Sequence, residues 1–370
     1  MKTVLLSFVY TIFCSGFFSI KNNYSPINAE TVALDYNNSA QTGLFETDEV
    51  LDIQLTGNIR ELMNDRGETP AYHSLDISYK GADSNTVSMA IEAKARGHFR
   101  KSLGGCSYPP LLLHFLKSEE QLSSIFKEQD KLKLVMPCSS DDYVIREWLA
   151  YRIYNLFTPK SFKARLVRLQ LNDTKKKNNT APFYAILLEE EEQMAKRNKS
   201  VLINRKQVKP AQTEPDAFLT MAVFEYLIGN TDWGVEYLQN IKLLATDSSS
   251  IFTAVPYDFD HAGIVGAPYA KPAEELEMSS VRERRYRGYC VTDMQKFDGV
   301  IARYNSLRKD IYQLYTDNPL AGAKYIKLTT AYLDDFYTVI NNPEKMQKEF
   351  GYPCNKNGTG NVIIKGLAKD

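Results

Sequence analysis

Apolar and polar residues follow two different spacings along this chain, and the spacing changes near its middle. Between about residues 87 and 188, apolar residues alternate with polar ones or form short runs that end at proline or polar residues. Both patterns are typical of strands. Beyond about residue 213 the apolar positions recur every three to four residues, as they do on one face of a helix. The pattern therefore predicts a β-rich half followed by a helical half.

The boundaries of these elements follow from proline, glycine and capping residues. Strands are predicted over residues 87–95, 111–116, 131–136, 162–171 and 183–188. A helix between the third and fourth strands is expected to be capped by Asp141-Asp142 and to end at Thr158-Pro159. Thr213 and Asp216 have the spacing of a capping box for a second helix, and Gly229 is its expected C-cap. Two more helices are predicted over about 292–315 and 320–341.

A hairpin is predicted between the second and third of these helices. Residues 240–245 and 251–255 read as strands, and the polar residues 247–250 supply the turn. A turn centred on Ser248 and Ser249 pairs positions whose numbers add up to roughly 497–498. Asn240 is therefore expected opposite Tyr257 or Asp258. The hairpin would bring an amide oxygen and a carboxylate to one end, with Asp232 on the loop that leads in.

This hairpin end carries the residue types that phosphoryl transfer needs. Mg²⁺ prefers oxygen ligands, and a carboxylate near an acceptor hydroxyl orients it. We expect Asn240 and Asp258 to be metal ligands, and Asp260 to be either a second carboxylate ligand or a support for the first. The alternative for each of these residues, and for Asp232, is a local role in a loop, a cap or a strand edge.

Composition leaves the class of protein open but excludes some partners. The chain has 370 residues, of which 44% are hydrophobic, which allows a large core and one to three domains. Its 45 basic and 45 acidic residues cancel, so no overall charge indicates nucleic acid or an anionic membrane. We expect no nucleic-acid partner.

The first residues resemble a targeting segment. Lys2 precedes an uncharged apolar run that extends to about Ile20. Residues 1–21 are predicted to be a signal peptide or, if uncleaved, an N-terminal membrane anchor, and Cys14 raises lipidation as a further alternative. Residues 22–46 are polar and are expected to form a flexible mature N-terminus. No later stretch approaches about 18 uninterrupted apolar residues.

The cysteines and histidines constrain the chemistry further. Four cysteines follow the leader (Cys106, Cys138, Cys290 and Cys354), and an even number in an exported chain predicts one or two disulfides. Buried free thiols are the alternative. The cysteine spacings are too wide for a zinc ribbon, and the four histidines form no tight ligand pattern. The sequence also has no nucleophile elbow and no Walker loop.

The order of these motifs resembles the CotH kinase family, atypical kinases named for a spore-coat protein. The resemblance covers roughly residues 87–262: an Arg96-Gly97 loop, a helix, a strand pair that ends in acidic residues, Gly229-Asn230-Thr231-Asp232, then Asn240 and Asp258-Phe259-Asp260. It implies an α+β, two-lobed atypical kinase-like fold. The implied β-rich N-terminal lobe spans residues 47–192. The helical C-terminal lobe, which contains the hairpin, spans residues 193–370.

The resemblance also implies roles for particular residues. Asp232 would be the catalytic aspartate, and Asn240 and Asp258 would hold Mg²⁺ or Mn²⁺ for ATP. For the phosphate-binding lysine, Lys133 with Glu147 has the right chain order, and Lys101 is the rival. Leu187 to Glu190, which includes Glu189, matches the hinge, where backbone groups would meet the adenine, although an acidic solvated turn is the alternative. After Arg96-Gly97 this sequence departs from the Asn-Ser that the family tends to have there, which leaves the lysine assignment open.

Together these features predict an exported phosphotransferase. It would transfer the γ-phosphoryl group of ATP to a hydroxyl, with a protein as the expected substrate. We expect it in a bacterial periplasm or cell envelope or outside the cell, touching a membrane only through an uncleaved leader. The alternatives are a non-catalytic binding or scaffold protein on the same fold and a metal-dependent phosphohydrolase. Arg282–Arg287 is expected either to recognise an acidic or phosphorylated partner or to form a solvated basic face.

Overall fold

The computed structural model describes residues 43–97, 106–246, 251–359, 362 and 364. The predicted leader, most of the predicted flexible N-terminus and Lys101 lie outside these residues. Residues Gln41–Asp370 belong to one compact unit that contains both strands and helices. In the described part of the chain, no helix is long and apolar enough to cross a membrane.

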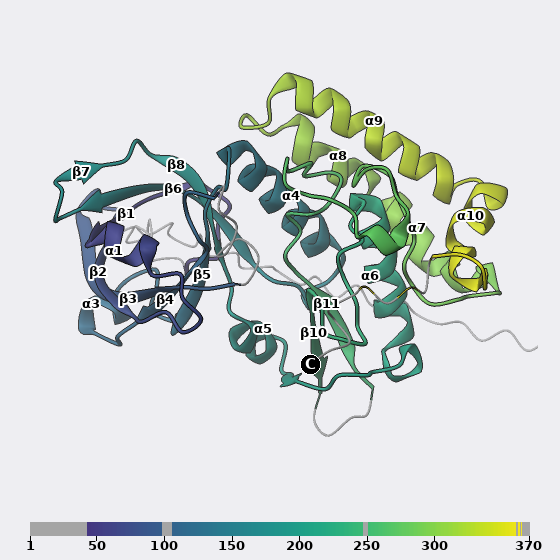
Figure 1. The fold of residues 1–370 in the computed structure, drawn as a ribbon, viewed down its shortest axis with the longest axis horizontal. Coiled ribbons are helices and arrows are strands. Elements are labelled where there is room, and N and C mark those ends of the chain that lie inside the picture. Colours follow the sequence, from purple (N-terminus) through teal and green to yellow (C-terminus); the bar gives the residue numbers. More distant parts are fainter. Residues whose placement is uncertain (1–42, 98–105, 247–250, 360–361, 363, 365–370) are drawn as a thin grey trace, which may run out of the picture. The chain divides into compact units, whose positions relative to one another are not determined.

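The largest element is an eight-stranded sheet that closes on itself. The strands lie in the order β1-β2-β3-β4-β5-β8-β6-β7, and β1 also pairs with β6 in parallel (Figure 1). All the other pairings are antiparallel. The bounds are β1 Leu51–Gly57, β2 His73–Lys80, β3 Thr86–Ala95, β4 Leu111–Phe115, β5 Lys131–Val135, β6 Ala164–Asp173, β7 Asn178–Asn179 and β8 Phe183–Leu188. The five strands predicted in this region are confirmed.

Alternating side chains fill the interior of this sheet. In β1, Ile53 and Leu55 are buried while Asp52 and Gln54 are exposed, because successive residues of a strand face opposite sides. The inward residues of these strands, β7 excepted, belong to one hydrophobic cluster that contains Ile77, Ile91 and Leu113. The short helices α1 (Ile59–Asn64) and α3 (Glu119–Leu122) contact β3. The closed sheet therefore has a core of its own.

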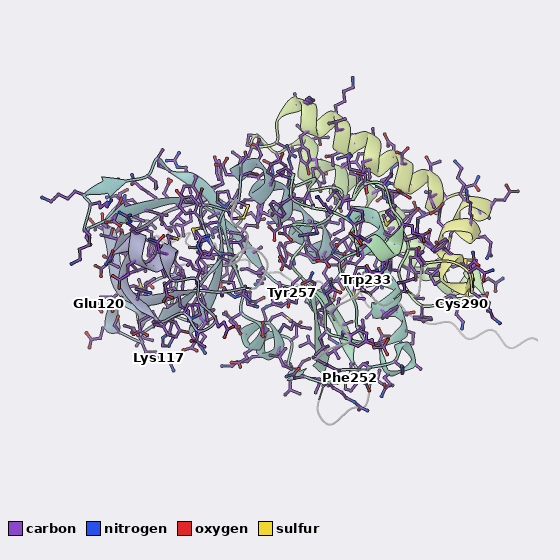
Figure 2. The ribbon with its side chains drawn as sticks, in the orientation of Figure 1. Lys117, Glu120, Trp233, Phe252, Tyr257 and Cys290 are labelled. Atoms are coloured by element: carbon purple, nitrogen blue, oxygen red, sulfur yellow. A yellow bond between two sulfur atoms is a disulfide. The ribbon has the colours of Figure 1, made fainter. Side chains whose placement is uncertain are left out.

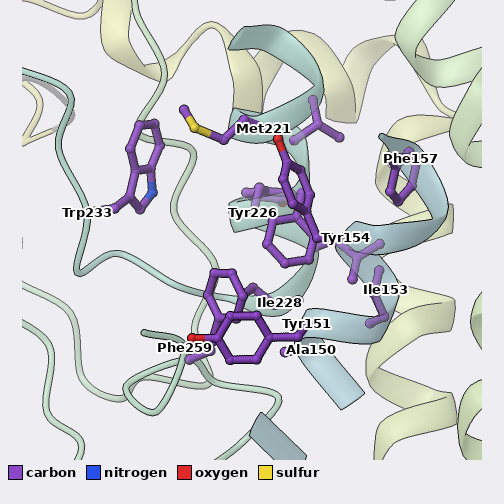
Figure 3. Packing of buried hydrophobic residues seen from close by; sticks show 14 of the residues in the cluster. Ala150, Tyr151, Ile153, Tyr154, Phe157, Met221, Tyr226, Ile228, Trp233 and Phe259 are labelled. Carbon is purple, nitrogen blue, oxygen red and sulfur yellow. The ribbon is translucent and has the colours of Figure 1, made fainter. Parts of the chain in front are cut away.

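A second core joins the helices to a smaller sheet. It includes residues of α4 (Asp141–Phe157), α6 (Pro215–Ile228), α7 (Asp298–Ser306), α8 (Arg308–Thr316), α9 (Ala323–Ile340) and α10 (Pro343–Phe350). Figure 3 shows the aromatic rings of Tyr154 and Phe259 packed where α4 faces α6. Trp148 of α4 donates its indole N–H to the backbone oxygen of Ala164 at 3.2 Å, which ties this helix to β6.

The smaller sheet contains the predicted hairpin. Its order is β11-β10-β9, with β9 at Val201–Ile203, β10 at Ile241–Ala245 and β11 at Thr253–Pro256. Ile241 pairs with Pro256 and Lys242 with Val255, so the predicted antiparallel register is confirmed. The edge strand β9 was not predicted, because three residues are too few to show a period.

Two predicted helix starts and one predicted helix are wrong in detail. Ser140, not the aspartates that follow it, caps α4 by accepting from the backbone N–H of Asp142. Glu214 caps α6, while Thr213 forms a bridge with Phe252 instead. The helix predicted over 292–315 is divided into a 3₁₀ turn (Met294–Phe297), α7 and α8. At the α7–α8 break the backbone oxygen of Arg303 accepts both from the Ser306 hydroxyl at 2.8 Å and from the backbone N–H of Leu307 at 3.1 Å.

Both disulfide pairs fit the sequence expectation. Cys106 is bonded to Cys138, and Cys290 to Cys354. The first bridge fixes the segment ahead of β4 to the end of β5, and the second fixes the segment ahead of α7 to the turn after α10. Two such bridges are compatible with an exported protein, because disulfides persist in oxidising compartments.

Gly229, the predicted C-cap of α6, adopts the left-handed conformation with φ of 68°. A Cβ atom here would meet the hydroxyl of Tyr332 and lie 3.4 Å from the backbone oxygen of Val281. We therefore expect Gly229→Ala to lower the unfolding free energy by about 1–2 kcal/mol, because the left-handed conformation and the contact with Tyr332 strain the alanine by more than the gain from a less flexible unfolded chain. Urea unfolding measures this. The control Gly299→Ala, in α7 with open space around it, should instead stabilise by about 0.5–1 kcal/mol; equal losses in both variants would contradict the account.

Candidate functional site

The open end of the β10–β11 hairpin is held in an unusual backbone conformation. The backbone N–H of Tyr257 donates to the backbone oxygen of Asn240 at 3.0 Å, so the two residues lie opposite each other as predicted. Asn240 and Asp258 both have positive φ, 49° and 64°. Non-glycine residues rarely adopt this region, and such residues cluster at functional sites. In Figure 2, Tyr257 and Phe252 lie at opposite ends of β11.

Asp232 lies directly against Asn240. The Asn240 Nδ2 donates to the backbone oxygen of Asp232 at 2.7 Å and to its Oδ2 at 3.0 Å. Gln239 donates its side-chain amide to the other carboxylate oxygen. The loop itself is fixed by Asn230, whose Oδ1 accepts from the backbone N–H of Asp232 at 3.0 Å. The structure therefore brings two of the predicted site residues into contact and adds Gln239, which the sequence analysis did not single out.

The surroundings of Asp232 shift the pKa of its carboxyl in opposing directions, with a net rise. Burial raises the pKa of this carboxyl, and the negative charge of Asp260 adds to the rise. The neighbouring His261, the bond from Asn240 and the positive Arg287 act in the opposite direction. A carboxylate with a raised pKa in a polar cluster has the character expected of a proton acceptor.

Phe259 anchors the Asp258-Phe259-Asp260 segment in the helical core. It is fully buried, and its ring centroid lies 4.6 Å from that of Tyr151 and 5.2 Å from that of Phe224 (Figure 3). The hydroxyl of Tyr151 accepts from the backbone N–H of Asp258 at 2.9 Å. Burial raises the pKa of Tyr151, and the negative charges of Glu147 and Asp258 raise it further, so carboxylates surround this hydroxyl.

Asp260 is more deeply placed than Asp258. It is 6% exposed, and the Tyr269 hydroxyl donates to its Oδ2 at 2.9 Å. Neither aspartate lies in a strand, because β11 ends at Pro256 and both residues follow it. Asp260 acts on the charge of Asp232 and on Tyr151, so it lies in the same acidic cluster.

The donor set at this end suits a hard divalent cation only in part. The described residues contain no group of three or more His, Cys, Asp or Glu side chains arranged to hold a metal ion. The Asn240 amide, however, uses its Nδ2 on Asp232, which orients its Oδ1 away from that residue. Amide and carboxylate oxygens are the ligands of Mg²⁺, which often takes only one or two carboxylates and relies on substrate phosphates for the rest. Asn240 and Asp258 fit that pattern.

Lys133 lies in a different ion network from the one predicted. Its Nζ is 2.6 Å from the Oε2 of Glu191, whose other oxygen is 2.9 Å from the Nζ of Lys242. Lys133 is 3% exposed, and burial lowers its pKa. Glu191 is the first residue of α5 (Glu191–Arg197). Among the described residues, the carboxylate paired with Lys133 is therefore Glu191 and not Glu147, because α5 brings Glu191 against this side chain from the middle of β5.

The structure also gives Glu147 and Glu189, the other two residues predicted to lie near the nucleotide, different partners from those expected. Glu147 is buried in α4, with its charge acting on Tyr151 near Asp258. Glu189 is 1% exposed and accepts from the Nε and Nη2 of Arg197, each at 2.9 Å, and from the backbone N–H of Lys163 at 3.0 Å. The Glu189 carboxylate thus serves the packing of α5 against the large sheet, and the solvated-turn alternative is wrong for this side chain.

Comparisons with known proteins add a distant likeness to solved structures. No protein-family model matches the chain, and no curated protein matches it. Among solved structures, the chain is similar to the crystal structure of a Helicobacter pylori proinflammatory kinase, CtkA. That likeness has a TM-score of 0.40 and 13% sequence identity, and it covers 65% of this chain and 94% of the other. At this similarity the neighbour assigns no role to any residue of the site, so the chemistry of the site follows from the residues of this chain alone.

Proposed function

We propose that this protein is an exported phosphotransferase that uses ATP and Mg²⁺ or Mn²⁺ to phosphorylate a hydroxyl group. The observation that carries the proposal is the contact between Asn240 and Asp232, with 3.0 Å between Nδ2 and Oδ2. This contact lies at the open end of the hairpin, and Asp258 follows the second hairpin strand there. A residue fit to orient a hydroxyl and two residues fit to hold a cation thus lie at one end of one hairpin. The acceptor is proposed to be a protein.

Asp232 would orient the acceptor hydroxyl and take its proton. The amides of Gln239 and Asn240 fix the rotation of the carboxylate, so no side-chain freedom is lost when the acceptor binds. Burial raises its pKa, which makes it a better proton acceptor than a solvated aspartate. Positioning supplies most of the acceleration in phosphoryl transfer, because the transferred group needs little covalent assistance.

Asn240 and Asp258 would hold the divalent cation through one amide oxygen and one carboxylate. The cation, when bound, would neutralise the charge of the phosphate oxygens. Asp260 would keep the segment in place through Tyr269, and it remains the candidate for a second carboxylate ligand. Lys133 and Lys242 are the described cations that share Glu191 beside Tyr257, and we propose that they attract the phosphates.

We also propose the finer arrangement that the resemblance implies. Two separate hydrophobic clusters, one inside the closed sheet and one among the helices, support a two-lobed plan with the site on the helical side of β5. The two disulfides support export to a periplasm, a cell envelope or the cell exterior.

One observation favours a non-catalytic binding protein as the second candidate. Lys133 is already neutralised by Glu191, and the pair is largely buried, so phosphates would have to compete with a formed salt bridge. Catalysis and mere binding differ in one readout. A catalyst releases or transfers the γ-phosphate of bound ATP, whereas a binding protein leaves the nucleotide intact.

The proposal predicts that nucleotide and metal together stabilise the native protein. A ligand that binds only the folded state stabilises it and so raises the melting temperature. At a ligand concentration one hundred times the dissociation constant, the gain in unfolding free energy is about 2.7 kcal/mol. We expect ATP with Mg²⁺ or Mn²⁺ to raise the melting temperature of the wild type and not that of Asp258→Ala. Differential scanning fluorimetry over a series of ATP concentrations measures this.

An exposed carboxylate supplies the matched control. Asp310 lies on the surface of α8, and Asp310→Ala removes the same charge without touching the hairpin. Its nucleotide response should equal that of the wild type. If ATP and metal shift neither the wild type nor the control, nucleotide binding is excluded, and equal shifts in all three proteins would remove Asp258 from the site.

A further inference from the structure

The segment Arg282–Arg287 contains four arginines, and three of them are withdrawn from solvent. Only Arg282 is exposed. Arg284 donates to the backbone oxygens of Leu227 and Tyr332, and its guanidinium lies 3.5 Å from the centre of the Tyr332 ring. Arg285 donates to the hydroxyls of Tyr352 and Thr359. The expectation of a solvated basic face is therefore wrong for most of the segment.

Arg287 differs from Arg284 and Arg285 because two of its three nitrogens have no hydrogen-bond partner among the described residues. Its Nη2 donates to the backbone oxygen of Val362 at 3.3 Å. Its Nε and Nη1 are buried and have no hydrogen-bond partner among the described residues. Buried guanidinium groups are normally paired, since removing the charge from water is costly. Two free, buried donors on one arginine indicate a place prepared for an acceptor.

The neighbouring acidic group Asp232 does not fill this place. Its charge acts on Arg287 and opposes the effect of burial, which lowers the pKa of the guanidinium to about 10. Arg287 forms no ion pair in the described part of the chain, and the oxygens of Asp232 accept from Gln239 and Asn240 instead. The two opposite charges are therefore close enough to interact and too far apart to bond directly.

Other buried polar atoms around Asp232 also lack partners within the described residues. They are the Nε1 of Trp233 and the Oε1 of Gln239, whereas the Asn230 side chain bonds to the buried Glu225 carboxyl. Trp233 and Tyr289, which follows Arg287 by two residues, both pack on Phe218, with ring centroids 6.3 and 5.0 Å from it. The Arg287 segment and the Asp232 loop thus pack against the same residue, Phe218 of α6. A concentration of unsatisfied polar atoms is a sign of a missing ligand or of ordered water.

We propose that Arg287 forms an oxyanion-binding subsite beside Asp232, and that it takes a carboxylate or phosphate group of the acceptor substrate. The paired N–H groups of a guanidinium match the two oxygens of such a group, so an acidic or already phosphorylated acceptor would be favoured. Naming the ligand as part of the acceptor rests on the proposed function. The subsite itself rests only on the unused donors of Arg287 and does not require phosphoryl transfer.

Inorganic phosphate is the probe for this subsite, without nucleotide or metal. Calorimetric titration at constant ionic strength should show binding to the wild type, and Arg287→Gln should weaken it at least tenfold. Arg287→Lys, which keeps the charge but loses the paired donors, should fall between them. Arg282→Gln, with the same charge change in the same segment, should match the wild type within twofold. Equal affinity in wild type and Arg287→Gln, or no binding to a folded wild type, would overturn the subsite.

A second titration separates the acceptor from the nucleotide as the source of the oxyanion. The wild type is first saturated with Mg²⁺ and a non-hydrolysable ATP analogue, and phosphate is then added. Phosphate binding that persists and still depends on Arg287 supports an acceptor subsite. Loss of phosphate binding would overturn that assignment, because the terminal phosphate of the nucleotide would then occupy the place. If the analogue does not bind while Arg287-dependent phosphate binding remains, the proposed function fails and the subsite stands.

Discussion

Asp232→Asn should reduce the rate of γ-phosphate transfer or release from ATP by about 10²–10⁴-fold, the usual contribution of a positioned proton acceptor. The amide can still occupy the same space and hold the loop. It cannot take a proton from an acceptor hydroxyl. The initial rate of γ-phosphate loss from labelled ATP, measured with saturating Mg²⁺ or Mn²⁺, gives the comparison.

The same variant should be at least as stable as the wild type. Because the pKa of Asp232 is raised in the folded protein, folding disfavours the ionised form, and stability falls as the pH rises through that pKa. A neutral amide removes this cost at neutral pH. The side chain of Gln239 can turn so that its unpartnered Oε1 accepts from the new amide. Active sites commonly trade stability for function in this way.

A melting temperature well below that of the wild type would mean that Asp232 serves the fold and not the reaction. A stable variant with full activity would equally contradict its assigned role. Asp310→Ala again supplies the comparison, since it should leave both the rate and the melting temperature close to those of the wild type.

Glu191→Gln should lower the unfolding free energy at neutral pH by about 2–3 kcal/mol. Breaking a buried ion pair costs about 3–5 kcal/mol, because the remaining charge is left unpaired, and the 24% exposure of Glu191 reduces this through solvent screening. The charge left behind is Lys133, whose side chain is only 4% exposed. Urea unfolding at pH 7 measures the loss.

The effect should depend on pH in a defined direction. Burial alone would raise the pKa of Glu191, but Lys133 and Lys242 outweigh it and lower the pKa from 4.5 to about 2. A lowered carboxyl pKa contributes stability above the unfolded value, which is lost as the pH falls from about 4.5 towards 2. The wild type and the variant should therefore converge in acid.

Glu192→Gln is the matched control for this pair. Glu192 is the exposed neighbour on the same turn of α5, and its loss should change stability by no more than about 0.5 kcal/mol. A gap between Glu191→Gln and the wild type that stays constant from pH 7 to pH 2 would mean that the ion pair is not its cause.

The hairpin was predictable because its register depends on local symmetry alone. Once a turn is predicted at Ser248 and Ser249, which lie outside the described residues, the pairing of Ile241 with Pro256 follows, and with it the place of Asn240 opposite Tyr257. The strands of the large sheet were equally accessible through their apolar alternation. Its closure by the parallel pairing of β1 with β6 was not, because that contact joins residues more than a hundred positions apart.

The charged partners were harder to predict for the same reason. Chain order suggested Glu147 for Lys133, whereas the fold of α5 places Glu191 there. A sequence signal for Glu191 was Lys242 in β10, two residues after Asn240. Lys242 binds the carboxylate oxygen of Glu191 that Lys133 does not use. Arg287 stood in a visible basic run, but only its unused donors distinguish it from Arg284 and Arg285.

The most direct test of the central claim is to observe the metal itself. Free Mn²⁺ has a sharp electron paramagnetic resonance signal that weakens when the ion is bound. With ATP held constant, one additional tight site for the Mn²⁺–ATP complex should appear in the wild type and disappear in Asp258→Asn. A wild type that binds no more of the complex than that variant does would contradict the claim that Asn240 and Asp258 form a metal–nucleotide site.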